Sequence, residues 1–397
     1  QKFIDYNIKD VQLVDRIDQK MGLISLALTM AYKGGVNVSD TMGTTAIWES
    51  IIYRRLLSKN IISPLKQIEG ISYNILGAAD LKDGDKAQSI AGGYVKDPQV
   101  GSHDWVVSFD LNSLYPNIIV QQNISPETLV HEYRRPQGIK YYMNHDRIVD
   151  YYAERTVIKK KMLKAQSAYE KTKDKALESE INQLHNNQMA IKILLNSLYG
   201  ALANKHFKYF DNALAESVTL TGQTVIQWAE EAINKEMNTL LKTSKDYVIA
   251  IDTDSVYISM AGLVKQFAPA DPVKFIDKIC EEHFKKVLKK SYDEFYFMMN
   301  GYTPRMEMDR EVIADRGIWT AKKRYILNVH NSEGVQYAEP KLKMMGIEAV
   351  KSSTPQICRD KFKEIFKVIM NKSEADVQKF IREFKAEFSS LPPEDIS

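Results

Sequence analysis

The chain is poor in cysteine, has no long apolar run and carries little excess charge of either sign. Its two cysteines, Cys280 and Cys358, are too few for a disulfide framework or a zinc cluster, so we expect structural thiols. The apolar run from Gly22 to Ala31 falls short of the ~18 residues that a membrane-spanning helix requires. The opening residues do not form a charged and then apolar leader, so we expect a cytoplasmic protein with no membrane partner.

Length and charge set broad limits. A chain of 397 residues is too long for one compact core, which predicts two or three domains. The formal net charge of +3 is too small to argue for or against a polyanionic partner by itself. Basic side chains do gather locally, since residues 151–175 hold eight Lys or Arg against three acids. A solvated helix face explains such a run as well as a phosphate-rich ligand does.

Two carboxylates stand at the tip of an apolar hairpin near the middle of the sequence. Residues 248–251 are apolar and lead into Asp252-Thr253-Asp254, and residues 256–258 lead back out. This pattern predicts a β-hairpin whose turn carries Asp252 and Asp254. Two acids so close repel each other, and a divalent cation removes that repulsion. Asp is also an ordinary turn residue, and a lone D-x-D in a hairpin is more often turn chemistry than a pair of metal ligands.

A second candidate strand ends in a third acid. Residues 105–109 form an apolar, β-prone run followed by Asp110, and Tyr115-Pro116 is expected to stop the strand. Carboxylates from two adjacent strand ends suit a hard cation such as Mg²⁺, which prefers oxygen ligands. Together the three acids favour a metal site over turn chemistry.

The remaining pattern predicts an α+β fold. Helical periodicity covers residues 10–32, 41–57, 151–173, 180–203, 213–240 and 272–296, and strand-like residues return at 324–329. The two long stretches at 151–173 and 180–203 predict an antiparallel helical hairpin inserted into a mixed sheet. Residues 77–93 are typical of a loop. Ser373 with Asp376 forms a capping box that predicts the start of a last helix.

Four motifs, in order, resemble those of family B DNA polymerases. They are D-x-x-S-L-Y-P at 110–116, K-x-x-x-N-S-x-Y-G at 192–200, D-T-D-S at 252–255 and K-K-R-Y at 322–325. Residues 337–340, 346–348 and 352–355 are also similar to the T-even-type phage replicative enzymes. The resemblance spans nearly the whole chain. Ile251 and Asn117 depart from the family, which often has Gly and Ser at these positions.

The resemblance implies the right-hand architecture of polymerases, with an antiparallel or mixed β palm and a helical hairpin as fingers. The implied domains are a C-terminal remnant of a 3′–5′ exonuclease domain at 1–45, a first part of the palm at 46–150, the fingers at 151–204, a second part of the palm at 205–345 and the beginning of a truncated thumb at 346–397. Tyr6 and Asp10 resemble the exonuclease motif Y-x-x-x-D. The partner acids of that motif are not in this sequence, so we expect no proofreading by this chain alone.

The resemblance also implies the chemistry of the acids. It makes Asp110 and Asp254 the principal ligands of two Mg²⁺ ions, for which Mn²⁺ could substitute. The Leu111 carbonyl completes the site and Asp252 supports it as a third catalytic acid. Two such ions lower the pKa of an attacking primer 3′-hydroxyl and neutralise charge on the leaving pyrophosphate.

Two further sets of residues follow from the matched motifs. Nucleotide binding is assigned to Ser113, Leu114, Tyr115, Arg155, Lys159, Lys192 and Asn196. The base pair and the primer-template are assigned to Tyr199, Gly200, Thr253, Lys322, Lys323, Arg324 and Tyr325. Spacings of three and four residues put Lys192, Asn196 and Tyr199 on one helix face, and their apolar neighbours predict that this part of the helix is largely buried. The Tyr115 ring is expected to exclude a ribose 2′-hydroxyl.

These inferences predict a template-directed DNA polymerase of phage DNA replication, which adds deoxynucleotides to a primer 3′-hydroxyl. Its expected partners are primer-template DNA and deoxynucleoside triphosphates, with a sliding clamp by analogy only. One alternative is a subunit of a split polymerase that needs a complementary polymerase fragment for activity. Another is a different palm-type enzyme such as a reverse transcriptase, which residues 192–200 disfavour.

Overall fold

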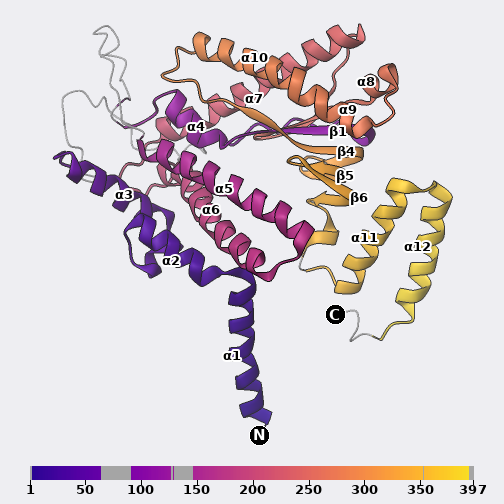
Figure 1. The fold of residues 1–397 in the computed structure, drawn as a ribbon, viewed down its shortest axis with the longest axis horizontal. Coiled ribbons are helices and arrows are strands. Elements are labelled where there is room, and N and C mark those ends of the chain that lie inside the picture. The colour runs from indigo at the N-terminus through magenta and orange to yellow at the C-terminus, as the bar shows by residue number, and fades with distance from the viewer. Residues whose placement is uncertain (1, 64–90, 127, 129–145, 352, 393–397) are drawn as a thin grey trace, which may run out of the picture. The chain divides into compact units, whose positions relative to one another are not determined.

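The computed structural model describes residues 2–63, 91–126, 128, 146–351 and 353–392 (Figure 1). The chain divides into two compact units. Unit 1 comprises Gln1–Ala91 and Tyr115–Thr219, and unit 2 comprises Gly92–Leu114 and Leu220–Ser397. Most of the loop predicted at 77–93 lies outside the described residues. The five domain boundaries inferred from the sequence stay predictions.

Unit 1 is built of helices. They are α1 (Lys2–Met21), α2 (Leu23–Gly34), α3 (Thr44–Ser58), all but the first residue of α4 (Leu114–Gln121), α5 (Asp146–Thr172), α6 (Lys175–Leu202) and the start of α7 (Asn212–Leu241), with a 3₁₀ turn at Val38–Met42. α5 and α6 pack against each other as the predicted helical hairpin (Figure 1). Asp174 caps α6, because its carboxylate accepts a hydrogen bond from the Ala176 N–H at 2.9 Å.

The helix predicted over residues 10–32 is two helices, so the expectation of a continuous helix is wrong. Gly22 separates α1 from α2 with a left-handed φ of 63°, a conformation that glycine adopts easily. Further along, Trp48 fastens α3 to α6, since its buried indole N–H donates to the Leu194 carbonyl at 3.0 Å. α1 buries none of its residues.

Unit 2 is organised around one six-stranded sheet. Its strands are β1 (Gly101–Leu111), β2 (Val248–Asp252), β3 (Ser255–Ser259), β4 (Met308–Ala321), β5 (Arg324–Ser332) and β6 (Val335–Met345). They lie in the order β2-β3-β1-β4-β5-β6, and every neighbouring pair is antiparallel. The antiparallel sheet together with the helices confirms the predicted α+β class.

Helices pack on the sheet of unit 2. They are α8 (Ala261–Phe267), α9 (Pro272–Ile279) and α10 (Lys285–Met298), with a π-helical turn at Cys280–Phe284 between the last two. α8 contacts β1, and α9 and α10 contact β4. Arg310 on β4 fastens α9, because its buried guanidinium donates to Asp277 at 2.6 Å and to Asn331 at 2.8 Å. Charge buried at this depth is stabilised by such paired hydrogen bonds.

The last two helices, α11 (Gln356–Asn371) and α12 (Glu374–Ser389), form a second helical hairpin. α12 begins at the predicted capping box, where the Ser373 hydroxyl accepts a hydrogen bond from the Asp376 N–H and the Asp376 carboxylate accepts one from the Ser373 N–H. Within the described residues, no helix combines the length and the apolar character needed to cross a membrane.

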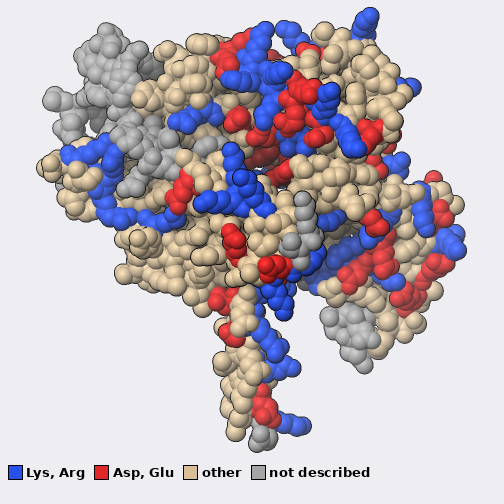
Figure 2. All heavy atoms as spheres, in the orientation of Figure 1, with Lys and Arg blue, Asp and Glu red and all other residues tan. Residues whose placement is uncertain are grey.

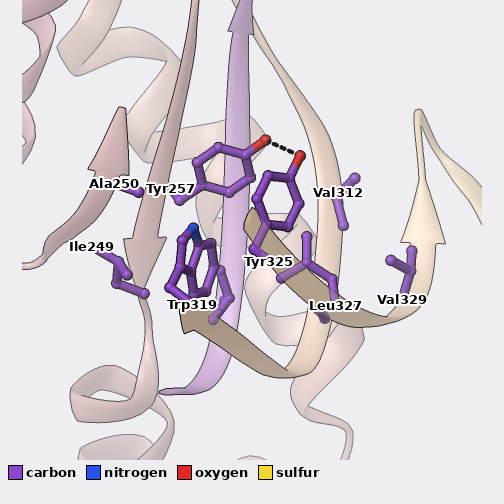
Figure 3. Packing of buried hydrophobic residues seen from close by; sticks show 10 residues of the cluster. Ile249, Ala250, Tyr257, Val312, Trp319, Tyr325, Leu327 and Val329 are labelled. Carbon is purple, nitrogen blue, oxygen red and sulfur yellow. Dashed lines mark hydrogen bonds between the residues drawn. The ribbon is translucent and has the colours of Figure 1, made fainter. Parts of the chain in front are cut away.

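An aromatic cluster fills the core of the sheet in unit 2 (Figure 3). Trp319 is 1% exposed, stacks on Tyr325 with ring centroids 5.5 Å apart, and meets the edge of Tyr257 at 5.4 Å. The hydroxyls of Tyr257 and Tyr325 are hydrogen-bonded at 2.7 Å, so the polar end of each ring has a partner inside the core. Tyr257 lies on β3, two residues beyond Ser255, and this packing therefore fixes the strand that follows the acidic turn.

Several elements were not predicted from the sequence, among them β4, β6 and α4. β4 and β6 are strands in which charged residues interrupt the apolar alternation. α4 begins at Leu114, where Tyr115-Pro116 was expected only to end a strand. Pro116 lies in the first turn of α4, where its missing N–H costs no helical hydrogen bond.

Candidate active site

The acidic turn joins β2 to β3 in unit 2. Asp252 is the last residue of β2, and the Asp254 N–H donates to its carbonyl at 2.7 Å. Thr253, between the two acids, has a left-handed φ of 58°, which is unusual for a β-branched residue. Its hydroxyl donates to Asp252 Oδ1 at 3.2 Å, and its N–H donates to the Tyr94 carbonyl at 2.9 Å. The conformation of the turn is thus held by hydrogen bonds from within and from a neighbouring segment.

Strand pairing brings Asp110 to this turn. β1 and β3 are neighbours, and Asp110 lies opposite Ser255 in their register. The Leu111 N–H donates to the Asp254 carbonyl at 2.9 Å, and the Ser255 hydroxyl donates to Asp110 Oδ1 at 2.7 Å. The structure therefore brings together Asp110, Leu111 and Asp254, which the sequence analysis named as metal ligands from two distant motifs.

The electrostatics at Asp110 show how crowded this position is with negative charge. The pKa of the Asp110 carboxyl is raised to about 7, first by burial and then by the neighbouring Asp254 and, more weakly, Glu311, while the Ser255 hydrogen bond and Lys343 oppose the rise. A carboxyl of this kind gains its charge only as the pH rises through about 7. A bound divalent cation would offset the repulsion between these acids, because it favours the ionised form of each carboxyl.

The donors at this position fit a hard divalent cation. In the part of the chain that the structure describes, no group of three His, Cys, Asp or Glu side chains is already gathered around one point. The available donors are carboxylate oxygens at the ends of two paired strands, and oxygen is the ligand that Mg²⁺ and Mn²⁺ prefer. The metal-binding roles of Asp110, Leu111 and Asp254 stay predictions that this chemistry supports.

Two lysines oppose the charge of these acids. Lys323 Nζ lies 3.1 Å from Asp252 Oδ1, and Lys343 Nζ lies 2.8 Å from Glu311 Oε1. The Ser108 hydroxyl also donates to Glu311 at 3.3 Å. Lys343 and Ser108 were missed because neither belongs to a matched motif. Lys343 lies on β6, a strand whose polar composition gave no periodic signal.

The K-K-R-Y motif divides between the surface and the core. Lys322 and Lys323 form the turn between β4 and β5, and both are exposed together with Arg324. Lys322 Nζ lies 3.0 Å from Asp97 Oδ1, a pair in which both side chains are largely solvated. Tyr325 is 5% exposed and belongs to the aromatic cluster. The three basic residues are therefore accessible to a ligand, whereas Tyr325 supports their strand from within.

In unit 1, two predicted residues from different motifs meet. The rings of Tyr115 on α4 and Tyr199 on α6 lie with centroids 4.7 Å apart and planes tilted by 47°. Burial raises the pKa of the Tyr199 phenol. Ser113, with a left-handed φ of 46°, lies in the turn before α4, and the buried Leu114 is the first residue of α4; both belong to unit 2. The nucleotide roles of these residues stay predictions.

The basic and amide side chains of unit 1 lie on helix surfaces. Lys192 and Asn196 are exposed one turn apart on α6, and Arg155 and Lys159 are partly buried one turn apart on α5. The buried residues nearby occupy the other face of α6; they are Ile191, Leu194, Leu195 and Leu198. The expectation of a largely buried segment is thus wrong for Asn196, because α6 is amphipathic here. Gly200 is exposed as well.

Tyr6 and Asp10, assigned to an exonuclease remnant, lie on α1 one turn apart. Tyr6 is 65% exposed, and Asp10 is exposed too. Nothing in their surroundings tests the assignment, which stays a prediction.

Comparisons with known proteins agree with the motifs. The family model "DNA polymerase family B" matches residues 41–394. The "DNA-directed DNA polymerase" of Enterobacteria phage T4 is 31% identical over 98% of this chain, and that of Escherichia phage RB69 is 31% identical over 94%. "DNA polymerase 1" of Pyrococcus abyssi is 28% identical over 78% of the chain. The chain spans 51%, 49% and 36% of these relatives, respectively. This chain belongs to DNA polymerase family B.

Proposed function

We propose that the chain carries out template-directed DNA synthesis, adding deoxynucleotides to a primer 3′-hydroxyl in phage DNA replication, with two Mg²⁺ ions at the acidic turn. Family membership supports the reaction class. The observation that carries the proposal is the pairing of β1 with β3, which sets Asp110 beside Asp254 although the two residues belong to separate motifs. Enzymes that transfer nucleotides use such paired carboxylates to hold divalent cations.

Divalent ions, when bound, lower the pKa of the attacking hydroxyl and neutralise charge on the leaving pyrophosphate. The protein's own part is to keep the ligands in place and ionised. Asp110 and Asp254 would supply carboxylate oxygens, the Leu111 carbonyl a neutral one, and Asp252 a nearby negative charge. Because the pKa of Asp110 is about 7, cation binding should strengthen as the pH rises through that value, since the ligand must lose its proton.

The remaining sites are proposed by motif, each within its own unit. In unit 2, Lys322, Lys323 and Arg324 are exposed and could follow the phosphates of a primer-template without reading its sequence. Lys323 would exchange its contact with Asp252 for one with DNA. Thr253 is proposed to contribute to the base pair from the turn.

In unit 1, Lys192 and Asn196 would bind the triphosphate, with Lys159 as a second point charge and Arg155 as a fork. The contact between Tyr115 and Tyr199 supports a joint role, in which Tyr199 with Gly200 supports the base pair and Tyr115 rejects ribonucleotides. Such rejection works by excluding the 2′-hydroxyl rather than by binding the deoxyribose. The comparisons do not favour the alternative of a split polymerase.

Primer extension with Mg²⁺ tests the proposal. The informative variant is Asp254→Asn, which removes one charge and keeps the size of the side chain. Its matched control is Asp271→Asn in the same unit, because Asp271 caps α9 and Asn caps helices as well as Asp does. We expect Asp254→Asn to lower the rate by more than about 100-fold, since even groups one step removed from a metal are worth 10- to 100-fold. Equal rates for the two variants would contradict the proposal.

A further inference from the structure

A short segment covers the free edge of the strand that leads into the acidic turn. β2 stands at one end of the sheet order. Residues 92–99, called here the edge segment, run along β2. The Lys96 N–H donates to the Ile251 carbonyl at 3.2 Å, and the Gln99 N–H donates to the Ile249 carbonyl at 2.9 Å. The edge segment thus satisfies the outward-facing carbonyls of β2 up to the turn.

The edge segment is anchored at two points. Lys96 Nζ lies 2.5 Å from a carboxylate oxygen of Glu230 on α7 and 2.5 Å from one of Asp246, just before β2. Burial alone would lower the pKa of the Lys96 ammonium, but its bonds to Asp246 and Glu230 outweigh burial and raise it. At the other end the Gln223 amide on α7 donates to the Gly92 carbonyl at 2.6 Å. The segment is therefore held against α7 as well as against β2.

Gly93, in this segment, touches the acidic turn itself. A Cβ atom at Gly93 would lie 2.7 Å from Thr253 Cγ2 and 2.8 Å from Thr253 Oγ1, distances that real Cβ atoms essentially never show. The next residue, Tyr94, accepts the Thr253 N–H at 2.9 Å. Thr253 has a left-handed backbone and directly links Asp252 to Asp254. A displacement of Thr253 therefore moves both acids.

We infer that Gly93 is a positioning residue of the acidic turn, because its missing side chain leaves room for Thr253 and lets the Tyr94 carbonyl hold the Thr253 N–H. Gly93 belongs to none of the matched motifs. Its role is to keep Asp252 and Asp254 in one fixed arrangement. The consequence for catalysis rests on the proposed function. The consequence for the geometry of the turn does not, since it concerns contacts within unit 2 alone.

Gly92 provides a matched control for Gly93. Among the residues that the structure describes, a Cβ atom at Gly92 meets no heavy atom within 4 Å. Neither glycine has a positive φ, so both positions accept alanine without backbone strain. Gly92→Ala and Gly93→Ala thus make the same chemical change in adjacent residues and differ in the contact with Thr253.

The first measurement is hydrogen–deuterium exchange of residues 248–259 in the metal-free chain. We expect these amides to exchange about tenfold faster in Gly93→Ala, because the turn opens more often, and to stay within about twofold of the parent protein in Gly92→Ala. Thermal unfolding of both variants controls for a general loss of stability. In primer extension, Gly93→Ala should lower kcat about tenfold or more, since small displacements of catalytic groups have large effects on rate.

A double-mutant cycle identifies the contact. Thr253→Ala removes Cγ2 and Oγ1, the atoms that a Cβ at residue 93 would meet. Adding Gly93→Ala to Thr253→Ala should therefore change the exchange rates of residues 248–259 little. The inference is overturned if Gly93→Ala exchanges like Gly92→Ala, or if its effect is unchanged without the Thr253 side chain. If the parent protein extends no primer but the exchange pattern is as expected, the proposed function fails while the positioning role stands.

Discussion

The two units hold their candidate residues in different ways. In unit 2, Asp110 and Leu111 lie on β1 and Asp254 lies in the turn before its partner β3, and their places are set by sheet register and by backbone hydrogen bonds. In unit 1, Lys192 and Asn196 project from the exposed face of α6, and only helical spacing relates them. The first arrangement depends on the whole sheet, whereas the second depends on a single helix.

Mutations in the two units should therefore affect folding and function differently. Changes to the core of the sheet or to its edge should disturb stability and the acidic turn together. Changes to the exposed side chains of unit 1 should alter ligand binding and leave stability as it was. On the face shown in Figure 2, Lys and Arg side chains are interspersed with Asp and Glu side chains.

The largest expected effect comes from the core of unit 2. Trp319→Ala should lower the free energy of unfolding by about 3–5 kcal/mol, since it leaves a cavity beside the rings of Tyr257 and Tyr325. Denaturation followed by circular dichroism measures it. Phe297→Ala is the control, because Phe297 is 76% exposed and its loss should cost no more than about 0.5 kcal/mol. Equal destabilisation by the two changes would contradict the described core.

A smaller effect is expected at the edge of the sheet. Lys96→Met should lower the free energy of unfolding by about 2 kcal/mol at pH 7, because it leaves Glu230 and Asp246 without their shared cation. Lys245→Met, which removes an exposed charge beside Asp246, should cost far less. Chemical denaturation of the three proteins checks this order.

The difference in unfolding free energy between the parent protein and Lys96→Met should also depend on pH. Burial tends to raise the pKa of Asp246, but the hydrogen bonds from Lys96 and Asn234 outweigh burial and lower it. A carboxyl whose pKa is lowered in the folded state stabilises the fold at pH values above its unfolded-state pKa of about 3.9. This contribution to stability is lost as the pH falls below that value and through the folded-state pKa. The gap between the parent protein and Lys96→Met should therefore shrink below about pH 4. A gap that is constant down to pH 3 would contradict the ion pair.

The smallest expected effect in free energy belongs to unit 1. Lys192→Ala should raise the KM for deoxynucleoside triphosphate about tenfold, equivalent to about 1.4 kcal/mol, because one charge on the phosphates is lost. The unfolding transition should not move, since Lys192 is exposed. Lys175→Ala removes an exposed lysine from the start of the same helix and should leave KM unchanged. If both variants behave alike, Lys192 has no specific role.

The sequence best predicted those elements whose conformation is determined by residues close together in the chain. The helical hairpin of α5 and α6 and the β2–β3 hairpin follow from uninterrupted periodicity, and the start of α12 follows from Ser373 and Asp376. β4 was missed because Asp309, Arg310 and Asp315 interrupt its apolar residues. In the fold, Arg310 is buried against Asp277 and Asn331, partners that no local pattern reveals.

The candidate site shows the same limit. The motifs named the acids, but only the strand order sets Asp110 opposite Ser255 and brings Lys343 from β6 close enough to act on Asp110. Gly93 could not be singled out either, since its importance lies in a contact with Thr253 across the edge of the sheet. Helical spacing placed Lys192 and Asn196 on one face of α6, but it did not predict that this face is exposed.

The most direct test of the shared acidic site is a titration with Mn²⁺ followed by electron paramagnetic resonance, at a pH well above 7 and without DNA or nucleotide. Asp110→Asn and Asp254→Asn should each weaken Mn²⁺ binding at least about tenfold, and Asp271→Asn should bind as the parent protein does. If either Asp110→Asn or Asp254→Asn keeps the parent affinity, the two acids do not form one cation site and the account is contradicted.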